Sequence, residues 1–395
     1  MKQTKKNIIL ISIILYGVTT IISYFIFANT SFTNSLIKTP IPQPKQVGGD
    51  KDGKLVFDES LPKTEACPLN GEKYSVQQKN WWEKHRPLGV MIENSVDARP
   101  QSGLQSADVI YEAVAEGGIT RFLAVFYCQD AGQIGPVRSA RTYFLDYISE
   151  YGENPLYAHV GGANTPGPAN ALGQIIDYGW NFYNDLNQFS VPFPIFKRIE
   201  NINGRPVATE HTMYSNTGAL WEYAADKRKL SNKDEDGVSW DKTFTPYTFK
   251  EDVALSSRPA AQKISFEFWD GYKDFSVVWN YNSATNLYTR QNGDKSHTDR
   301  NTKKPLTAKN IVLLFMKESN ANDGYENNLH MLYGTKGTGK ALIFMDGKEI
   351  EGRWKKPTRE SRTLLTDAVG RQIDLNRGLT WFEILATDTD VTVTP

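Results

Sequence analysis

The 395-residue chain lacks an excess of charge of either sign and is poor in cysteine. It carries 45 lysines and arginines against 45 aspartates and glutamates. Because nucleic-acid binding usually draws on a basic excess, this balance argues against a nucleic-acid partner. Hydrophobic residues make up 39% of the chain and aromatic residues 12%, which is enough to bury a core, and the length beyond residue 80 favours two domains.

The two cysteines are Cys67 and Cys128. In an oxidising compartment such a pair predicts a disulfide. The alternatives are a buried, inert Cys128 and a free Cys67. A reactive thiol is not favoured, because the sequence shows no Cys-His arrangement near either residue.

The histidines lack the spacing of a local zinc site, since neither H-x-x-x-H nor H-x-x-E-H occurs. We therefore expect no metal and no cofactor. His159 precedes two glycines, and His211 lies in the segment TEHTMY. Each of them is interpreted either as a hydrogen-bonded structural histidine or as a residue of a site.

Residues 8–28 form an apolar stretch of 21 residues without a charge, which is long enough for a helix to span a bilayer. A cleaved signal peptide is the alternative, but residues 25–28 make a poor cleavage site. Lys2, Lys5 and Lys6 precede the stretch and predict a cytoplasmic N-terminus with an extracytoplasmic body. We expect residues 1–28 to be an uncleaved, single-pass anchor in the cell membrane.

The rest of the chain divides by composition. Residues 29–80, with three prolines at 40, 42 and 44 and a glycine-rich piece after them, predict an extracytoplasmic linker. Residues 81–228 alternate short strands with helical segments, which predicts a mixed α/β domain. Residues 262–390 carry closely spaced strands and predict a mainly antiparallel β sandwich or barrel. The expected fold class is α+β, behind a single transmembrane helix.

The most informative stretch is 94–141, where the apolar runs 109–111 and 122–126 predict two buried strands. Isolated buried charges are costly, so the charged residues nearby either brace loops as ion pairs or form an anion-recognising rim of arginines. The Gly135-Pro136 turn predicts a helix starting at Pro136, whose free amides would add to an anion site. The charged residues are Arg99, Glu112, Glu116, Arg121, Arg138 and Arg141.

Three sequence runs carry a resemblance: ARPQSGL at 98–104, ADVIYEAVAEGGITRFLAVF at 107–126 and IGPVRSARTYF at 134–144. They are similar to the YerB-like family of bacterial membrane-anchored envelope proteins of unknown function, and the similarity extends from about Trp81 to the C-terminus. The resemblance implies a two-part, surface-exposed envelope protein without established catalytic residues. YerB-like relatives are often lipoproteins, and this chain departs from them because no cysteine near residues 8–28 could accept a lipid.

Two functions stay open from the sequence. The first is a non-catalytic module whose interdomain groove, lined by Arg99, Arg121, Arg138 and Arg141, binds an anionic cell-wall component or a partner protein. The alternative is a hydrolase or lyase acting on a cell-wall polymer, with Glu112 or Glu116 and His159 as its acid and base. Two acids flanking a ligand-sized space would favour the enzyme, whereas arginines paired with acids would favour binding or bracing.

The remaining candidates have weaker motifs. Ser139 lacks the G-x-S-x-G elbow of a nucleophile. Arg290 with residues 297–299 is interpreted as polar bracing or as the second half of an interdomain cleft. The predicted ligand-binding residues are Asn94, Arg99, Gln101, Glu112, Glu116, Arg121, Arg138, Ser139, Arg141, His159 and His211.

Overall fold

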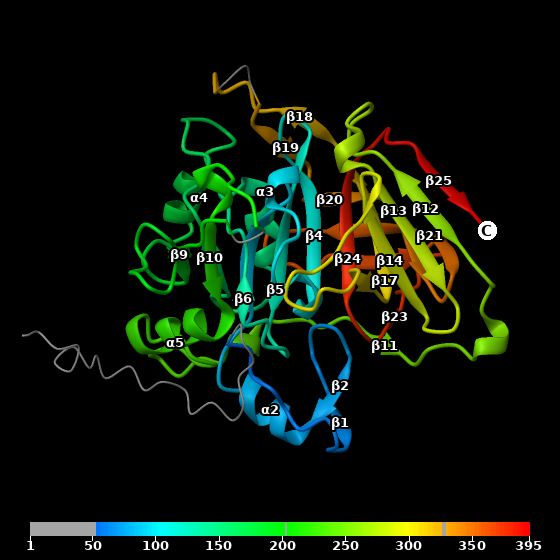
Figure 1. Ribbon diagram of the computed structural model, residues 1–395, viewed down its shortest axis with the longest axis horizontal. Helices are drawn as coiled ribbons and strands as arrows, with labels where there is room; N and C mark the ends of the chain where they lie inside the picture. The colour runs from blue at the N-terminus through cyan, green and yellow to red at the C-terminus, as the bar shows by residue number, and fades with distance from the viewer. Residues whose placement is uncertain (1–52, 202–203, 326–328) are drawn as a thin grey trace, which may run out of the picture. The chain divides into compact units, whose positions relative to one another are not determined.

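The computed structural model describes residues 53–201, 204–325 and 329–395 (Figure 1). The chain divides into two units, Met1–Val47 and Gly48–Pro395. All described residues lie in the second unit. The predicted anchor and the first part of the predicted linker therefore fall outside them. No helix in the described part of the chain is long and apolar enough to cross a membrane.

The largest sheet has ten strands in the order β22-β21-β20-β17-β24-β4-β5-β3-β7-β8. β24 pairs in parallel with both β17 and β4, so one continuous sheet joins the first half of the body to the second. The strands are β3 (Leu88–Glu93), β4 (Val109–Glu116), β5 (Ile119–Phe126), β7 (Leu156–His159), β8 (Asp185–Asn187), β17 (Asn310–Met316), β20 (Gly337–Met345), β21 (Lys348–Lys356), β22 (Leu364–Asp367) and β24 (Thr380–Ala386).

A second sheet has six strands, all antiparallel, in the order β15-β14-β13-β12-β25 with β16 paired to β14. Along β13, buried Val277, Trp279 and Tyr281 alternate with less buried residues, which marks a sheet with one face turned to the core. The strands are β12 (Lys263–Phe266), β13 (Val277–Asn282), β14 (Leu287–Asn292), β15 (Lys295–Ser296), β16 (Thr307–Ala308) and β25 (Val391–Thr394).

Four helices and four small sheets complete the described residues. In Figure 1, α4, α5, β9 and β10 gather on one flank of the large sheet. The helices are α2 (Val76–Trp82), α3 (Thr142–Ile148), α4 (Ala171–Asp177) and α5 (Thr217–Lys227). The small sheets pair β1 (Lys63–Ala66) with β2 (Lys73–Ser75), β10 (Met213–Asn216) with β6 (Gln133–Ile134) and β9 (Lys197–Arg198), β11 (Phe249–Lys250) with β23 (Leu375–Asn376), and β18 (Glu318–Asn320) with β19 (Met331–Tyr333).

The core lies on both faces of the large sheet. On one face, Tyr111 of β4 stacks on Phe382 of β24 and on Tyr147 of α3, with ring centres 4.8 and 4.6 Å apart. On the opposite face, Trp381 packs edge-on against Trp279 of the six-stranded sheet at 5.2 Å. Successive side chains of a strand point to opposite faces, so Trp381 and Phe382 enter different layers. Coverage of both faces explains the nearly continuous apolar runs of β17 and β24.

The expected α+β class is confirmed at the level of a mostly β structure with four described helices and both mixed and antiparallel sheets. A separate sandwich or barrel at 262–390 is not formed, because β17 and β20 to β22 extend the large sheet through β24 and β4. The domain boundaries at 81–228 and 262–390 stay a prediction. The end of the predicted linker is folded: β1, β2 and most of α2 lie there, and Cys67 and Leu69 are buried.

Candidate functional site

Glu112, in the middle of β4, lies in a fully buried polar network. Its Oε2 accepts a hydrogen bond from Arg290 Nη2 at 2.5 Å, and neither side chain is exposed. Trp381 donates its Nε1–H to the same oxygen at 3.3 Å, and its ring centre lies 4.9 Å from the guanidinium carbon. Thr120 and Asn94 donate to the other oxygen. A buried ion pair is stable only with such additional hydrogen bonds. The bonds of Glu112 to Arg290 and Trp381 also join the first half of the body to the second.

His297 connects this ion pair to the loop before β4. Arg290 Nη1 donates to His297 Nδ1 at 2.7 Å, and His297 Nε2 lies 2.8 Å from Gln101 Oε1. Burial and the positive charges of Arg290 and Arg99 hold the pKa of His297 well below its usual range. The ring is therefore neutral and donates from Nε2. Gln101 Nε2 in turn donates to Asn94 Oδ1 at 3.0 Å.

A second buried carboxyl, Glu383 of β24, is the register partner of Glu112. Trp279 Nε1 donates to Glu383 Oε1 at 2.9 Å, and Arg290 Nε lies 3.9 Å from that oxygen. Burial, and then the charge of Glu112, raise the pKa of Glu383 well above its usual range. This shift favours the protonated form of Glu383, and Glu112 is the acid that lies closer to Arg290.

Arg99 lies between this network and a cavity. Its Nε donates to Asn94 Oδ1 at 3.1 Å, and its guanidinium carbon lies 5.1 Å from the ring centre of Phe275. Burial and the charge of Arg290 lower the pKa of Arg99 to about 10, so Arg99 keeps its charge at neutral pH. The cavity has a volume of about 440 Å³ and is lined from both halves of the body by Val96, Arg99, Pro100, Arg205, Asp274 and residues 292–298. We call it the Arg99 groove.

At the end of the β4–β5 hairpin, Glu116 pairs with two arginines. Arg121 Nη2 lies 2.9 Å from Glu116 Oε2, and Arg141 Nη2 contacts Glu116 Oε1. The arginine side chains are 4% and 5% exposed, whereas that of Glu116 is 23% exposed. Burial lowers the pKa of both arginines. Among the described residues, Arg141 Nε is buried and has no hydrogen-bond partner.

Glu93 organises an adjoining group. Its Oε2 lies 2.9 Å from His211 Nδ1, and its Oε1 lies 3.4 Å from Arg138 Nε. Burial acts to raise the pKa of Glu93, but the His211 hydrogen bond and the charge of Arg138 outweigh it and lower that pKa. The hydrogen bond that His211 donates to Glu93 raises the pKa of His211.

The two groups are neighbours, because Glu93 on β3 is the register partner of Arg121 on β5. Ser139 joins them through its carbonyl oxygen, which accepts a hydrogen bond from Arg121 Nη1 at 2.9 Å. With its side chain 28% exposed, Arg138 is the most accessible of the three arginines. We call the following residues the rim cluster: Glu93, Glu116, Arg121, Arg138, Arg141 and His211.

The prediction of a helix starting at Pro136 is wrong, because α3 begins at Thr142. The segment before it is extended and bonded to distant strands. Val137 N donates to Met213 O at 2.6 Å, and Arg138 N donates to Met91 O at 2.9 Å. Since these amides are used in long-range pairing, residues 137 and 138 offer no free helix amides to the rim cluster.

His159 lies apart from the rim cluster, at the end of β7. Its Nε2 lies 2.5 Å from Asp185 Oδ1, and its Nδ1 lies 2.6 Å from the carbonyl oxygen of Gly161. The side chain is fully buried. Because both ring nitrogens already have acceptor partners, the geometry favours a structural role for His159.

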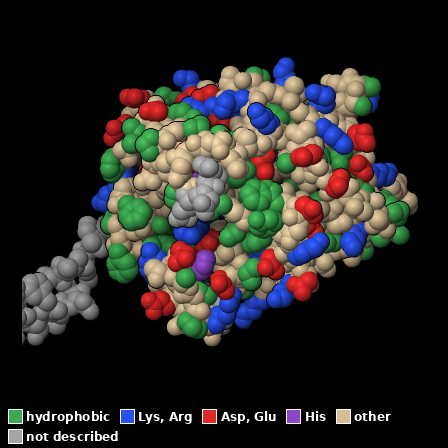
Figure 2. All heavy atoms as spheres, turned by 90° about the horizontal axis from the view of Figure 1, so that it is seen from above, with side chains coloured by type: hydrophobic (Ala, Val, Ile, Leu, Met, Phe, Trp, Pro, Cys, Tyr) green, Lys and Arg blue, Asp and Glu red, His purple; other side chains and the backbone are tan. Residues whose placement is uncertain are grey.

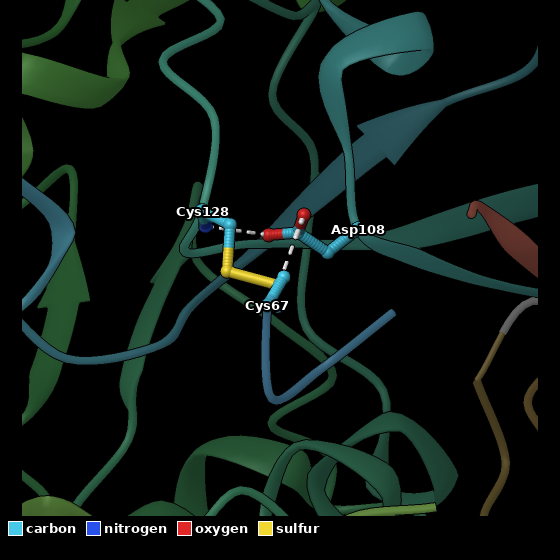
Figure 3. Close-up of side chains that lie close together, drawn as sticks. All are labelled: Cys67, Asp108 and Cys128. Carbon is cyan, nitrogen blue, oxygen red and sulfur yellow. Dashed lines mark hydrogen bonds between the residues drawn. A yellow bond between two sulfur atoms is a disulfide. The ribbon is translucent and has the colours of Figure 1, made fainter. Parts of the chain in front are cut away.

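Cys67 and Cys128 are joined by a disulfide beside the buried carboxylate of Asp108 (Figure 3). Cys67 Sγ lies 3.8 Å from Asp108 Oδ1, and Asp108 Oδ2 accepts the backbone N–H groups of Tyr127 and Cys128 at 2.7 and 2.8 Å. Burial raises the pKa of Asp108 to about 7, although these backbone hydrogen bonds oppose the shift. The three possible ligand atoms lie within 4.8 Å of one another, but the bonded sulfurs offer no thiolate to a metal.

The predicted site residues thus fall into three places. The buried network contains Asn94, Gln101 and Glu112, and Arg99 lies between it and the Arg99 groove. The rim cluster and its edge contain Glu116, Arg121, Arg138, Ser139, Arg141 and His211. His159 lies apart from both. Sequence reasoning missed Glu93 and Glu383. A signal existed, since each stands in or at the end of an apolar strand run, LGVMIE and TWFEILA, where an acid needs a buried partner.

The face of the molecule shown in Figure 2 has no broad field of one charge. On the face shown in Figure 2, Lys and Arg side chains are interspersed with Asp and Glu side chains. Local clusters, and not one large field of a single sign, therefore distinguish the parts of this face.

Comparison with known proteins agrees with the resemblance of the motifs. The chain matches the family described as "Protein of unknown function (DUF3048)", with the N-terminal domain at residues 73–231 and the C-terminal domain at residues 264–382. A relative from Bacillus subtilis (strain 168), named "Putative lipoprotein YerB", is 29% identical over 322 residues, which cover 81% of this chain and 86% of the relative.

The fold agrees as well. The crystal structure of the YerB protein from Bacillus subtilis is similar to this structure with a TM-score of 0.67 and 25% sequence identity. The match covers 84% of this chain and 100% of that chain. The YerB-like assignment is confirmed: the chain belongs to the DUF3048 family of proteins of unknown function.

Proposed function

We propose that this protein is a non-catalytic binding module of the cell envelope that recognises an anionic cell-wall component or a partner protein through the rim cluster. One observation carries the proposal. Three arginines of the cluster face two glutamates, which leaves a positive excess at a partly exposed edge. Arginine presents a planar fork that suits carboxylate and phosphate groups. Arg138, whose side chain is 28% exposed, is the arginine that such a ligand reaches first.

The Arg99 groove supports the same function. Residues 93–99 connect it to the rim cluster, because Ser95 Oγ lies 3.3 Å from His211 Nδ1 and Val96 lines the groove. Its volume of about 440 Å³ lies within the usual range of small-ligand sites, roughly 300–1,000 Å³. A ligand whose anionic group binds the rim cluster would therefore place its uncharged part in the Arg99 groove.

The proposal places the body outside the cell, tethered to the membrane. Residues 8–28 have the length and composition of an anchor, and a curated relative is named as a lipoprotein. A disulfide is also typical of an oxidising, extracytoplasmic compartment. The anchor of this chain would be the apolar stretch itself, with the N-terminus in the cytoplasm.

The geometry gives less support to a hydrolase or lyase. Glu112 is buried and bound to Arg290, Thr120 and Asn94, so it does not face a substrate-sized space. Glu116 is bound to two arginines, which stabilise its carboxylate and oppose a role as a general acid.

A pelleting assay separates the two functions. Residues 48–395 form one compact unit that contains the core and the disulfide, so this unit can be mixed with purified cell-wall polymer. The binding module predicts that protein pellets with the polymer and that no fragments are released. Fragments that disappear in Glu112→Ala or Glu116→Ala would instead establish an enzyme. If neither binding nor fragments are seen, the anionic polymer is not the ligand, and a protein partner is sought with the same variants.

A further inference from the structure

Beyond the proposed function, we propose that the flank formed by α4, α5 and the β8–β9 loop is a membrane-facing surface that rests on the bilayer. Four of the twelve large, exposed hydrophobic side chains of the described residues lie between residues 176 and 193. They are Ile176, Phe182, Phe189 and Phe193, with exposures of 60%, 62%, 77% and 82%. We call these four residues the apolar strip.

The strip is held on a firm framework. Arg228, at the end of α5, lies with its guanidinium carbon 5.8 Å from the ring centre of Phe182 and donates from Nη2 to Ser190 Oγ at 3.4 Å. The ring of Phe189 packs against Gly161, where an added Cβ would lie 3.2 Å from it. Further along, Ser215 Oγ of β10 donates to the carbonyl oxygen of Ile195 at 2.8 Å. The exposed rings therefore belong to one ordered surface.

The tether joins the body at the same flank. Gly53 is the first residue of the described chain, and a Cβ added to it would lie 3.2 Å from Asn216 Nδ2. Asn216 is the N-cap of α5, and Arg228 is the C-cap at its other end. The helix has 11 residues and is therefore about 17 Å long. Between the predicted anchor and Gly53 stand 24 residues, which can reach at most about 85 Å. The tether therefore joins the body beside α5 and is long enough for this flank to reach the bilayer.

The chemistry of the strip favours lipid over a sugar polymer. Phenylalanine has no polar group, whereas tyrosine and tryptophan combine an apolar ring with a hydrogen-bond donor. Cations stand around the strip at Lys197, Arg198, Arg228 and Lys229, where long basic side chains can reach lipid phosphates. The acids nearby are Asp177, Glu200, Asp226 and, beside Tyr183, Asp234, Glu235 and Asp236, so the flank has no excess of positive charge. We therefore assign the contact to the rings.

Vesicle sedimentation tests the proposal with residues 48–395 and no anchor. The probes are vesicles of phosphatidylcholine and of phosphatidylcholine mixed with phosphatidylglycerol. We expect the wild type to sediment with both. Phe189→Ser/Phe193→Ser should weaken the partition by at least about tenfold, because two rings no longer enter the interface. Lys197→Gln/Lys229→Gln should sediment nearly like the wild type, because the acids of the flank balance its cations.

Two controls make the result decisive. Leu255→Ser/Val369→Ser removes two side chains that are 59% and 74% exposed outside the strip, and it should sediment like the wild type. Arg138→Ala, in the rim cluster, should also leave vesicle binding unchanged, so this test is independent of the proposed function. Equal sedimentation of the wild type and the Phe189→Ser/Phe193→Ser variant would overturn the proposal. The proposal would also be overturned if the wild type did not bind vesicles but pelleted with wall polymer, and if this pelleting were lost in the Phe189→Ser/Phe193→Ser variant.

Discussion

At the scale of single residues, the buried network shows how a core tolerates charge. Arg290 is surrounded by Glu112, Glu383 and three aromatic rings, yet only Glu112 needs to be ionised. The raised pKa of Glu383 favours its protonated form, in which the two carboxyls together carry one negative charge and match the one positive charge of the guanidinium. The two glutamates should therefore respond differently to the same substitution.

We predict that Glu383→Gln changes the free energy of unfolding by less than about 1 kcal/mol, because glutamine resembles a protonated glutamate. Glu112→Gln should destabilise by about 3–5 kcal/mol, because it leaves the buried charge of Arg290 without its anion. Urea denaturation of both variants checks this. Equal losses in the two variants would show that both carboxyls are ionised in the folded protein.

The Glu93–His211 pair makes stability depend on pH. The pKa of His211 is raised, so its contribution is complete below the unfolded value of 6.5 and is lost as pH rises through the folded pKa. The pKa of Glu93 is lowered, so its contribution is present above the unfolded value of 4.5 and is lost as pH falls through the folded pKa. The pair stabilises most between these two values.

We therefore predict that His211→Gln lowers the free energy of unfolding by about 1 kcal/mol near pH 5.5 and by much less near pH 9. Thermal unfolding of both proteins across this range measures the difference. If the loss is the same at both pH values, the ring does not carry the charge that the pair requires.

At the scale of elements, β4 places two glutamates of one strand in different surroundings. Glu112 faces the six-stranded sheet, whereas Glu116 lies at the rim, and the register with β5 shifts between Val114 and Glu116. Sequence alone predicts the strand from its apolar run. It does not predict the irregularity, which depends on how β5 pairs with β4.

The segment before α3 shows the same limit. A Gly-Pro turn favours a helix start locally, but hydrogen bonds to β3 and β10 hold residues 137 and 138 extended. Those partners stand far away in the sequence, at Met91 and Met213. All members of the rim cluster except Glu93 were nonetheless predicted from the sequence, because arginines and glutamates close to core strands need oppositely charged partners.

The disulfide attaches the β1–β2–α2 element to the end of β5. It closes a loop of 61 residues, so the chain-entropy relation predicts that Cys67→Ala/Cys128→Ala destabilises by about 4 kcal/mol. Urea denaturation of the wild type with a reductant should shift to the midpoint of the variant. A reductant that leaves the wild-type midpoint unchanged would mean that the bond is absent or inaccessible to reduction, and mass spectrometry after thiol labelling distinguishes these cases.

At the scale of the whole molecule, the two family domains share one sheet. β24 lies between β17 and β4, and the buried network crosses from Glu112 to Arg290, a separation of 178 residues. Sequence composition suggested two separate parts because each half has its own strand pattern. Pairing between strands so far apart leaves no local signal, which is why the shared sheet could not be foreseen.

We predict that residues 53–250 produced alone do not unfold cooperatively, because the edge of β4 and the face that packs on Trp381 would be exposed. Production together with residues 251–395 should restore a single folded complex. Circular dichroism during heating and size-exclusion chromatography report on both. A stable, monomeric 53–250 fragment would show that the shared sheet is not needed for folding.

The most direct test of the rim cluster is the affinity of residues 48–395 for purified cell-wall polymer, measured by pelleting. Arg138→Ala and Arg141→Lys should each weaken binding by about tenfold or more, because the first removes a charge and the second keeps the charge but loses the planar fork. Arg371→Ala, whose side chain is 80% exposed elsewhere, should bind like the wild type. Wild-type binding by both rim variants, with their folding intact, would contradict the account.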